Sequence, residues 1–197
     1  MNTFTHILSN INWVDVAMLV LFIRIIFIGV KTGFVTELFK LSGVFCAVFV
    51  ALHYYTSFAV FVAQKTNWPI DYLELSFFVL LVCSMVLVIK LLRDGFLMLF
   101  KFETTHAGFN QWGAGVLAMV RVLFLSSLIV YGILLSHVEY LQRQTLSSVA
   151  HRLVLKAAPN TYIFLYHNFI GKVFTKEKFN EDVLRVSSRN GIGRKPL

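Results

Sequence analysis

The sequence predicts an all-α, polytopic membrane protein with four transmembrane helices and an amphipathic C-terminal region. Of its 197 residues, 57% are hydrophobic and 14% are charged, whereas a soluble globular chain has roughly 45–50% and about 25%. The mean hydropathy is +0.73. Four apolar stretches also reach the length of about 20 residues that crosses roughly 30 Å of hydrocarbon. This composition excludes an ordinary cytosolic enzyme domain, a disordered chain and a small disulfide-stapled secreted module.

The four spans are expected at residues 13–30, 34–64, 75–100 and 111–136. The second is the cleanest, because residues 41–64 contain no Asp, Glu, Lys or Arg. Arg24 interrupts the first span, and Arg121 interrupts the fourth. The turn Lys31–Thr32–Gly33 is so short that we expect the first two helices to form an antiparallel hairpin. Residues 1–137 are therefore expected to form one four-span bundle.

The sequence pattern changes after the fourth span and predicts amphipathic, interfacial helices over residues 138–174. Apolar residues recur at helical spacing up to Ala157, and Pro159 is expected to end that helix. An aromatic-rich stretch from Tyr162 to Val173 follows and is too short to cross a bilayer. Two arrangements stay open: the helices lie in the plane of the headgroup boundary, or they fold back onto the bundle or a neighbouring subunit. Residues 175–197 are polar and charged, which predicts a flexible basic tail.

The charge distribution predicts membrane lipids as partners. Lys and Arg number 18 against 10 Asp and Glu, a net charge of +8, and from Val138 onward ten basic residues oppose four acidic ones. A basic segment beside a membrane attracts anionic lipid headgroups by about 1 kcal/mol per residue, so we expect these headgroups at the C-terminal region. Nucleic acid is not an expected partner, because no groove-reading motif accompanies the charges. Basic residues flank the spans five against four, which leaves the side of the termini open.

Charged residues inside the spans are the sharpest candidates for a functional site. An arginine in mid-span, such as Arg24 or Arg121, costs about 2.5–3.5 kcal/mol on insertion scales. One hypothesis is a polar path or an anion-recognition site between the helices. The other, which we favour, is a buried ion pair that fixes helix packing, with Glu37, Asp15 or Asp94 as partner. Asp15 and Glu37 each admit a further interpretation, as a carboxylate at the positive end of a helix dipole.

Small residues predict close helix packing, and no motif predicts catalysis. Gly29 and Gly33 are four residues apart, the spacing that lets membrane helices approach closely, and Gly33 also supplies the turn. Cys46 and Cys83 lie in apolar runs, and the six histidines show no metal-ligand spacing. We therefore expect no metal, no cofactor and no enzymatic activity.

These residues form a pattern that resembles the colicin V production protein (CvpA) family. An aspartate, Asp15, stands at the head of the first span, and a basic-Gly-Phe turn that includes Gly33 and Phe34 precedes Glu37. The second span ends in His53–Tyr54–Tyr55. A polar, glycine-rich segment that begins at Asn110 then leads to Arg121. The resemblance covers residues 11–136. The chain departs from the family pattern at several positions: Arg24, Thr32, Asn110, Gln111, Ala114 and Ala118.

The resemblance implies a four-helix protein of the bacterial inner membrane that is required for production or export of a peptide toxin and is tied to envelope homeostasis. Under this hypothesis the protein is a non-enzymatic scaffold, and its partners are a second copy of the chain or secretion and envelope proteins. The intramembrane residues that hold the bundle are then Asp15, Gly29, Gly33, Phe34, Glu37 and Arg121. An alternative is a small oligomeric channel or transporter subunit, with Arg24 and Arg121 lining a path.

Overall fold

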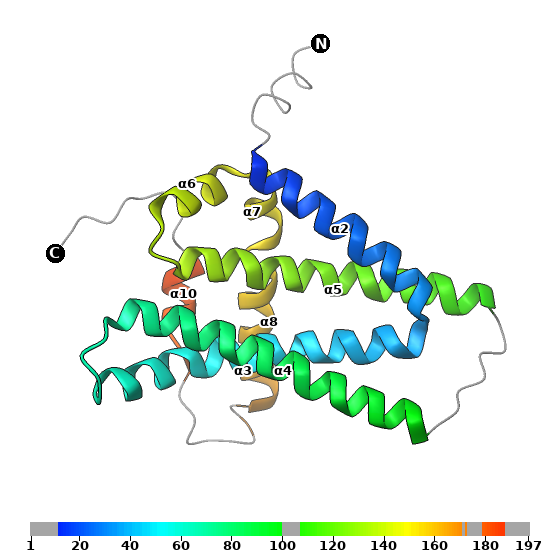
Figure 1. Cartoon of the computed structure of the whole chain (residues 1–197), viewed down its shortest axis with the longest axis horizontal. Helices are drawn as coiled ribbons and strands as arrows, with labels where there is room; N and C mark the ends of the chain where they lie inside the picture. The colour runs from blue at the N-terminus through cyan, green and yellow to red at the C-terminus, as the bar shows by residue number, and fades with distance from the viewer. Residues whose placement is uncertain (1–11, 100–106, 171, 173–178, 188–197) are drawn as a thin grey trace, which may run out of the picture.

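The computed structural model describes residues 12–99, 107–170, 172 and 179–187, and every regular element among them is a helix (Figure 1). Four long helices follow one another: α2 (Trp13–Thr32), α3 (Phe34–Ala63), α4 (Ile70–Leu99) and α5 (Ala107–Leu135). Each is long and apolar enough to cross a membrane. The predicted fold class is confirmed: the protein is all-α, with four transmembrane helices.

The order of contacts along the helices gives their directions. Helices α3 and α5 run parallel, and α4 runs antiparallel to α3 beside them (Figure 1). Aromatic pairs mark this order: Phe45–Phe124 and then Tyr55–Tyr131 between α3 and α5, and Phe39–Phe96 and then Phe58–Phe77 between α3 and α4. The α2–α3 turn, the end of α4 and the start of α5 therefore lie at one end of the bundle, which we call the turn end.

The prediction that the first two helices form an antiparallel hairpin is correct for the turn, but the two helices do not pack along their length. The chain does reverse at Gly33, but α2 and α3 diverge from that turn and α5 packs against both (Figure 1). The reason is the small-residue contact between α2 and α5. At Gly29 the backbone of α2 comes so near Ala118 that a Cβ on the glycine would lie 2.3 Å from the Cβ of that alanine. Close backbone approach of this kind increases dispersion contact between membrane helices.

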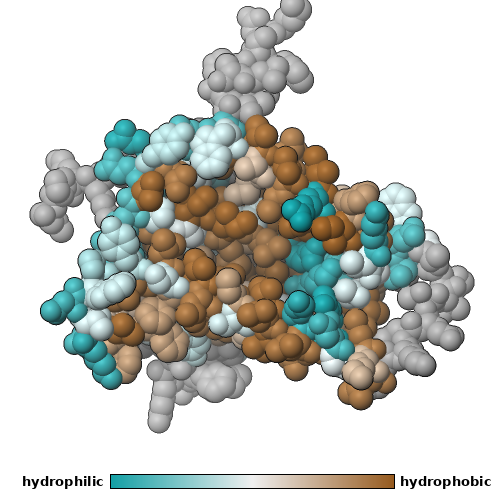
Figure 2. All heavy atoms as spheres, viewed as in Figure 1, coloured by the Kyte–Doolittle hydropathy of each residue, from teal (hydrophilic) through white to brown (hydrophobic). Residues whose placement is uncertain are grey.

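Helices α2 and α4 expose most of their apolar side chains. Leu73 and Phe78 are the only buried residues of α4, and Leu91 is 71% exposed. On the face drawn in Figure 2, apolar surface covers much of the molecule. A soluble monomer rarely presents such a continuous apolar surface. In a membrane protein this surface faces lipid tails.

The segment after the fourth span folds back onto the bundle. It forms α6 (Glu139–Ser147), α7 (Val149–Val154), α8 (Ala157–Leu165) and the π-helical turn η1 (Tyr166–Ile170). Helices α7 and α8 run across α3 and α5 (Figure 1), and Ala158 and Tyr162 are fully buried. These contacts match the fold-back arrangement, whereas an interfacial position in the membrane stays a prediction.

The helix boundaries in this segment differ from the predicted ones. Pro159 does not end a helix. It lies in the first turn of α8, where a backbone N–H has no partner within the helix to lose. The chain breaks earlier, first at Ser148 and again at Leu155 and Lys156, between α7 and α8. The side chain of Ser148 accepts a hydrogen bond from the backbone N–H of His151 and so starts α7.

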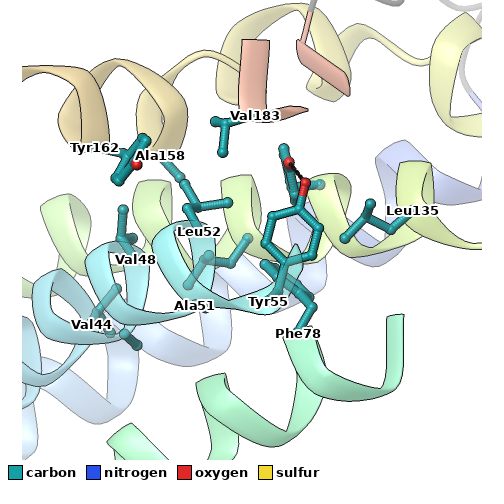
Figure 3. Packing of buried hydrophobic residues seen from close by; sticks show 13 residues of the cluster. Val44, Val48, Ala51, Leu52, Tyr55, Phe78, Leu135, Ala158, Tyr162 and Val183 are labelled. Atoms are coloured by element: carbon teal, nitrogen blue, oxygen red, sulfur yellow. Dashed lines mark hydrogen bonds between the residues drawn. The ribbon is translucent and has the colours of Figure 1, made fainter. Parts of the chain in front are cut away.

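The prediction of a flexible basic tail over 175–197 is wrong for residues 179–187. The side-chain amide of Asn180 donates to the backbone carbonyl of Leu52 at 2.8 Å, and helix α10 (Asp182–Ser187) follows. Val183 is fully buried in the cluster that also holds Tyr55 (Figure 3). The polar composition of the tail as a whole hid this short amphipathic pattern. Residues 175–178 and 188–197 of the predicted tail lie outside the described residues.

Candidate functional site: a buried charge cluster at the turn end

A single glycine makes the turn between α2 and α3. Gly33 has φ 85°, a left-handed conformation that glycine adopts without steric cost. It carries no side chain to cap the start of α3, and Asn110 of α5 supplies the cap instead. The amide oxygen of Asn110 accepts a hydrogen bond from the backbone N–H of Phe34 at 2.6 Å. This bond attaches the start of α5 to the turn.

Two further glycines let side chains and helices meet closely at this end. A Cβ on Gly113 would lie 2.8 Å from the ring of Phe34, so the absence of a side chain makes room for that ring. Gly29 faces Ala118 and also lies next to the carboxylate of Glu37. Of the predicted site residues, Gly29, Gly33 and Phe34 are therefore all at one junction between α2, α3 and α5.

Glu37 lies at the centre of this junction and is fully buried. One carboxylate oxygen, Oε1, accepts hydrogen bonds from the hydroxyl of Thr32 and from Nζ of Lys40, each at 2.6 Å. The other oxygen, Oε2, lies 3.1 Å from Nη2 of Arg121. Helices α2, α3 and α5 thus each contribute a contact to the carboxylate of Glu37. Its negative charge faces two cations, Lys40 and Arg121.

Arg121 reaches this carboxylate from the middle of α5. Its side chain is 9% exposed, and long basic side chains in membrane helices extend in this way toward polar surroundings. Within the described residues, Nε of Arg121 and Oε2 of Glu37 have no hydrogen-bond partner, so the two groups form an ion pair without the alignment of a hydrogen bond. Arg121 also lines a cavity of about 250 Å³ between α3, α4 and α5.

The other two predicted residues lie elsewhere. Asp15 belongs to a capping box at the start of α2, where its carboxylate accepts a hydrogen bond from the backbone N–H of Asn12 at 3.2 Å. Arg24 is exposed in mid-α2, makes no ion pair within the described residues, and does not line the cavity that contains Arg121. The two arginines are therefore not brought together. Asp94, the third candidate partner, pairs with Arg93.

Three members of the cluster, Lys40, Thr32 and Asn110, were not predicted from the sequence. Lys40 could have been found, because Glu37 and Lys40 are three residues apart and so lie on one helix face. Thr32 and Asn110 gave no comparable signal. Their roles depend on the turn geometry and on the rotation of α5, which the local sequence does not encode.

Helix α3 carries a second polar cluster that was also missed. The second predicted span ends in His53–Tyr54–Tyr55, and in the structure His53 and Tyr55 are buried. Nδ1 of His53 lies 2.9 Å from the hydroxyl of Tyr162 in α8, and the hydroxyls of Tyr55 and Tyr131 are 3.0 Å apart (Figure 3). Burial raises the pKa of Tyr162 to about 12, so this hydroxyl keeps its proton. These bonds hold α8 and α5 against α3.

The charge cluster can hold the three helices together. Both oxygens of Glu37 face cations or a hydroxyl, so the carboxylate serves as a counter-ion that joins three helices. Removing one partner of a buried ion pair typically costs about 3–5 kcal/mol. Among the described residues, no group of three or more His, Cys, Asp or Glu side chains gathers as a metal site would need.

Comparison with known families identifies the chain. The family model for the colicin V production protein matches residues 14–159. The chain belongs to this family. The match includes the whole charge cluster and continues beyond residue 136, where the sequence resemblance ended, through α6 and α7 to the start of α8. The segment that folds back onto the bundle is therefore largely part of the family domain. No match was found among curated proteins or solved structures.

Proposed function

We propose that this member of the colicin V production family is a multi-pass protein of the bacterial inner membrane that supports the production or export of a peptide toxin, and with it envelope homeostasis, as a non-enzymatic scaffold. The observation that supports this most strongly is the family match over residues 14–159. The four long apolar helices agree with a membrane location.

The geometry of the charge cluster favours a scaffold over a channel. A conducting path within one chain that is lined by both intramembrane arginines needs them at one cavity. Arg121 lines a cavity and pairs with Glu37, whereas Arg24 lies exposed on α2. A carboxylate that joins three helices stabilises the fold, which suits a protein that functions by binding partners on its surface and not by catalysis.

The scaffold presents two kinds of surface to partners. The apolar faces of α2 and α4 are available to lipid, to a second copy of the chain or to a secretion or envelope protein. Anionic headgroups are the proposed partners of the basic C-terminal region. Neither surface calls for a cofactor.

The test is complementation of a producing strain that lacks the protein. Toxin activity in the culture medium and the abundance of the protein in membranes are both measured. The wild-type chain restores toxin release. Glu37→Gln and Arg121→Gln reduce abundance and release together, because they break the buried ion pair.

The matched controls are Glu139→Gln and Arg143→Gln. Glu139 and Arg143 also form an ion pair, but both side chains are 81% exposed, and such pairs contribute about 0–1 kcal/mol. Both controls restore release fully. Undiminished toxin release from the strain without the protein would refute the proposed function.

A further inference from the structure

We propose that the cavity between α3, α4 and α5 binds the phosphate headgroup of one anionic phospholipid. We call this cavity the basic cleft, defined by the four basic side chains that line it: Lys40, Lys90, Arg93 and Arg121. The inference is independent of the proposed function, because it concerns binding and not toxin export.

The first observation is an excess of positive charge at the basic cleft. Glu37 pairs with Lys40 and Arg121, and Asp94 pairs with Arg93. Four cations against these two carboxylates leave two positive charges uncompensated. Lys90 is exposed and forms no ion pair within the described residues. A charge excess at the edge of an apolar bundle is stabilised when an anion binds there.

The second observation is the unsatisfied guanidinium of Arg121. The side chain is more than nine-tenths buried and lines the basic cleft, and its Nε finds no hydrogen-bond acceptor among the described residues. A guanidinium offers five N–H donors in a planar fork that matches the oxygens of a phosphate. The part of Arg121 that lines the basic cleft brings such donors to it.

The third observation is that the rest of the basic cleft is apolar. Phe39, Val86 and Ile89 line it together with the basic residues. Its volume of about 250 Å³ compares with a share of roughly 30 Å³ for each water molecule in the liquid. The cleft therefore has room for a headgroup phosphate and part of the glycerol backbone that joins it to the acyl chains. Free phosphate would leave the apolar wall without a partner.

The position of the basic cleft also suits a lipid. It lies at the turn end, where Lys40 is seven residues into α3 and Lys90 and Arg93 are in the last three turns of α4. Val86, which lines it, and Leu87 and Leu91 beside it on α4 are exposed, so the basic cleft borders the apolar surface of α4. Hydrophilic surface breaks the apolar surface in this part of the molecule (Figure 2).

The test is native mass spectrometry of the full-length protein from detergent micelles supplemented with either phosphatidylglycerol or phosphatidylcholine. The expected result is one retained phosphatidylglycerol per chain and no retained phosphatidylcholine. Lys90→Gln and Arg93→Gln are each expected to weaken retention about fivefold, the equivalent of about 1 kcal/mol per charge. Lys90→Gln removes no contact of the fold, so its thermal midpoint stays at the wild-type value.

Lys31→Gln is the matched control. Lys31 lies at the same end of the bundle but stacks over the ring of Phe27 outside the basic cleft, and its replacement leaves retention unchanged. Equal retention of the two lipids would overturn the proposal, and so would equal loss in Lys31→Gln and Lys90→Gln. Release of the lipid by excess inorganic phosphate would assign the site to free phosphate and overturn the lipid assignment.

Discussion

Glu37 shows how one residue can connect three helices in an apolar protein. Its carboxylate is fully buried, yet it accepts hydrogen bonds from Thr32 and Lys40 and faces Arg121. One carboxylate and two cations give this group a net charge of +1, and their pairing lowers the cost of placing these ions in a membrane. The sequence identified both Glu37 and Arg121, but left three carboxylates as candidate partners of the arginine. Local sequence could not choose among them, because the choice depends on how α3 and α5 are rotated.

Removing the charge of Glu37 should therefore destabilise the bundle strongly. Glu37→Gln leaves Arg121 buried without a counter-ion, and we expect the free energy of unfolding to fall by about 3–5 kcal/mol. The measurement is equilibrium unfolding of the purified protein in detergent. Glu139→Gln is the control at an exposed pair and should change the value by less than about 1 kcal/mol. Equal stability of the two variants would contradict the role of Glu37.

Gly29 is predicted to be intolerant of a single methyl group. Gly29→Ala places a Cβ 2.3 Å from that of Ala118, and the resulting overpacking should cost about 1–3 kcal/mol. Adding Ala118→Gly removes the opposing Cβ and should restore most of the loss in the same unfolding assay.

A second glycine provides the control for this prediction. A Cβ on Gly95 would meet no atom within 4 Å, so Gly95→Ala should leave stability unchanged or raise it slightly, since alanine favours a helix. If Gly29→Ala behaves like Gly95→Ala, then α2 and α5 are not in the close contact described.

At the scale of elements, α5 is the helix against which the others assemble. It packs on both α2 and α3, and Ser127 in its second half accepts the backbone N–H of Ala158 and donates to the carbonyl of Leu155, where α7 gives way to α8. The sequence predicted that α5 exists but not this central position. Hydropathy is a local property and locates helices well, whereas the choice of neighbours depends on contacts between residues far apart in the chain.

Helix α10 should contribute measurably to stability. Val183 is fully buried, and Leu184 beside it is 44% exposed. Val183→Ala should lower the free energy of unfolding by about 2 kcal/mol through lost packing, and Leu184→Ala by no more than about 0.5 kcal/mol. Thermal unfolding in detergent distinguishes the two. No difference between the variants would mean that this segment does not pack into the bundle.

At the scale of the whole molecule, the sequence predicted the composition of the fold better than its assembly. The four long helices, and Gly29, Gly33 and Glu37 as candidate packing residues, could all be proposed from local pattern. The divergence of α2 from α3 and the docking of α8 could not be proposed in this way. The sequence of the fold-back segment is short and fits a position at the membrane interface equally well. Both depend on small-residue contacts and buried hydroxyls that only the folded chain brings together.

If the four helices lie in hydrocarbon, the reactivity of Cys83 should show it. Cys83 is exposed near the middle of α4, so in water it would react readily, since the thiolate that attacks a maleimide forms in water. In a Cys46→Ala background in opened native membranes, we expect a charged maleimide to leave Cys83 unlabelled until the protein is denatured. An Arg143→Cys chain that also carries Cys83→Ala should label at once, because that position is 81% exposed outside the spans. Labelling of Cys83 as fast as that control, without denaturant, would contradict the membrane fold.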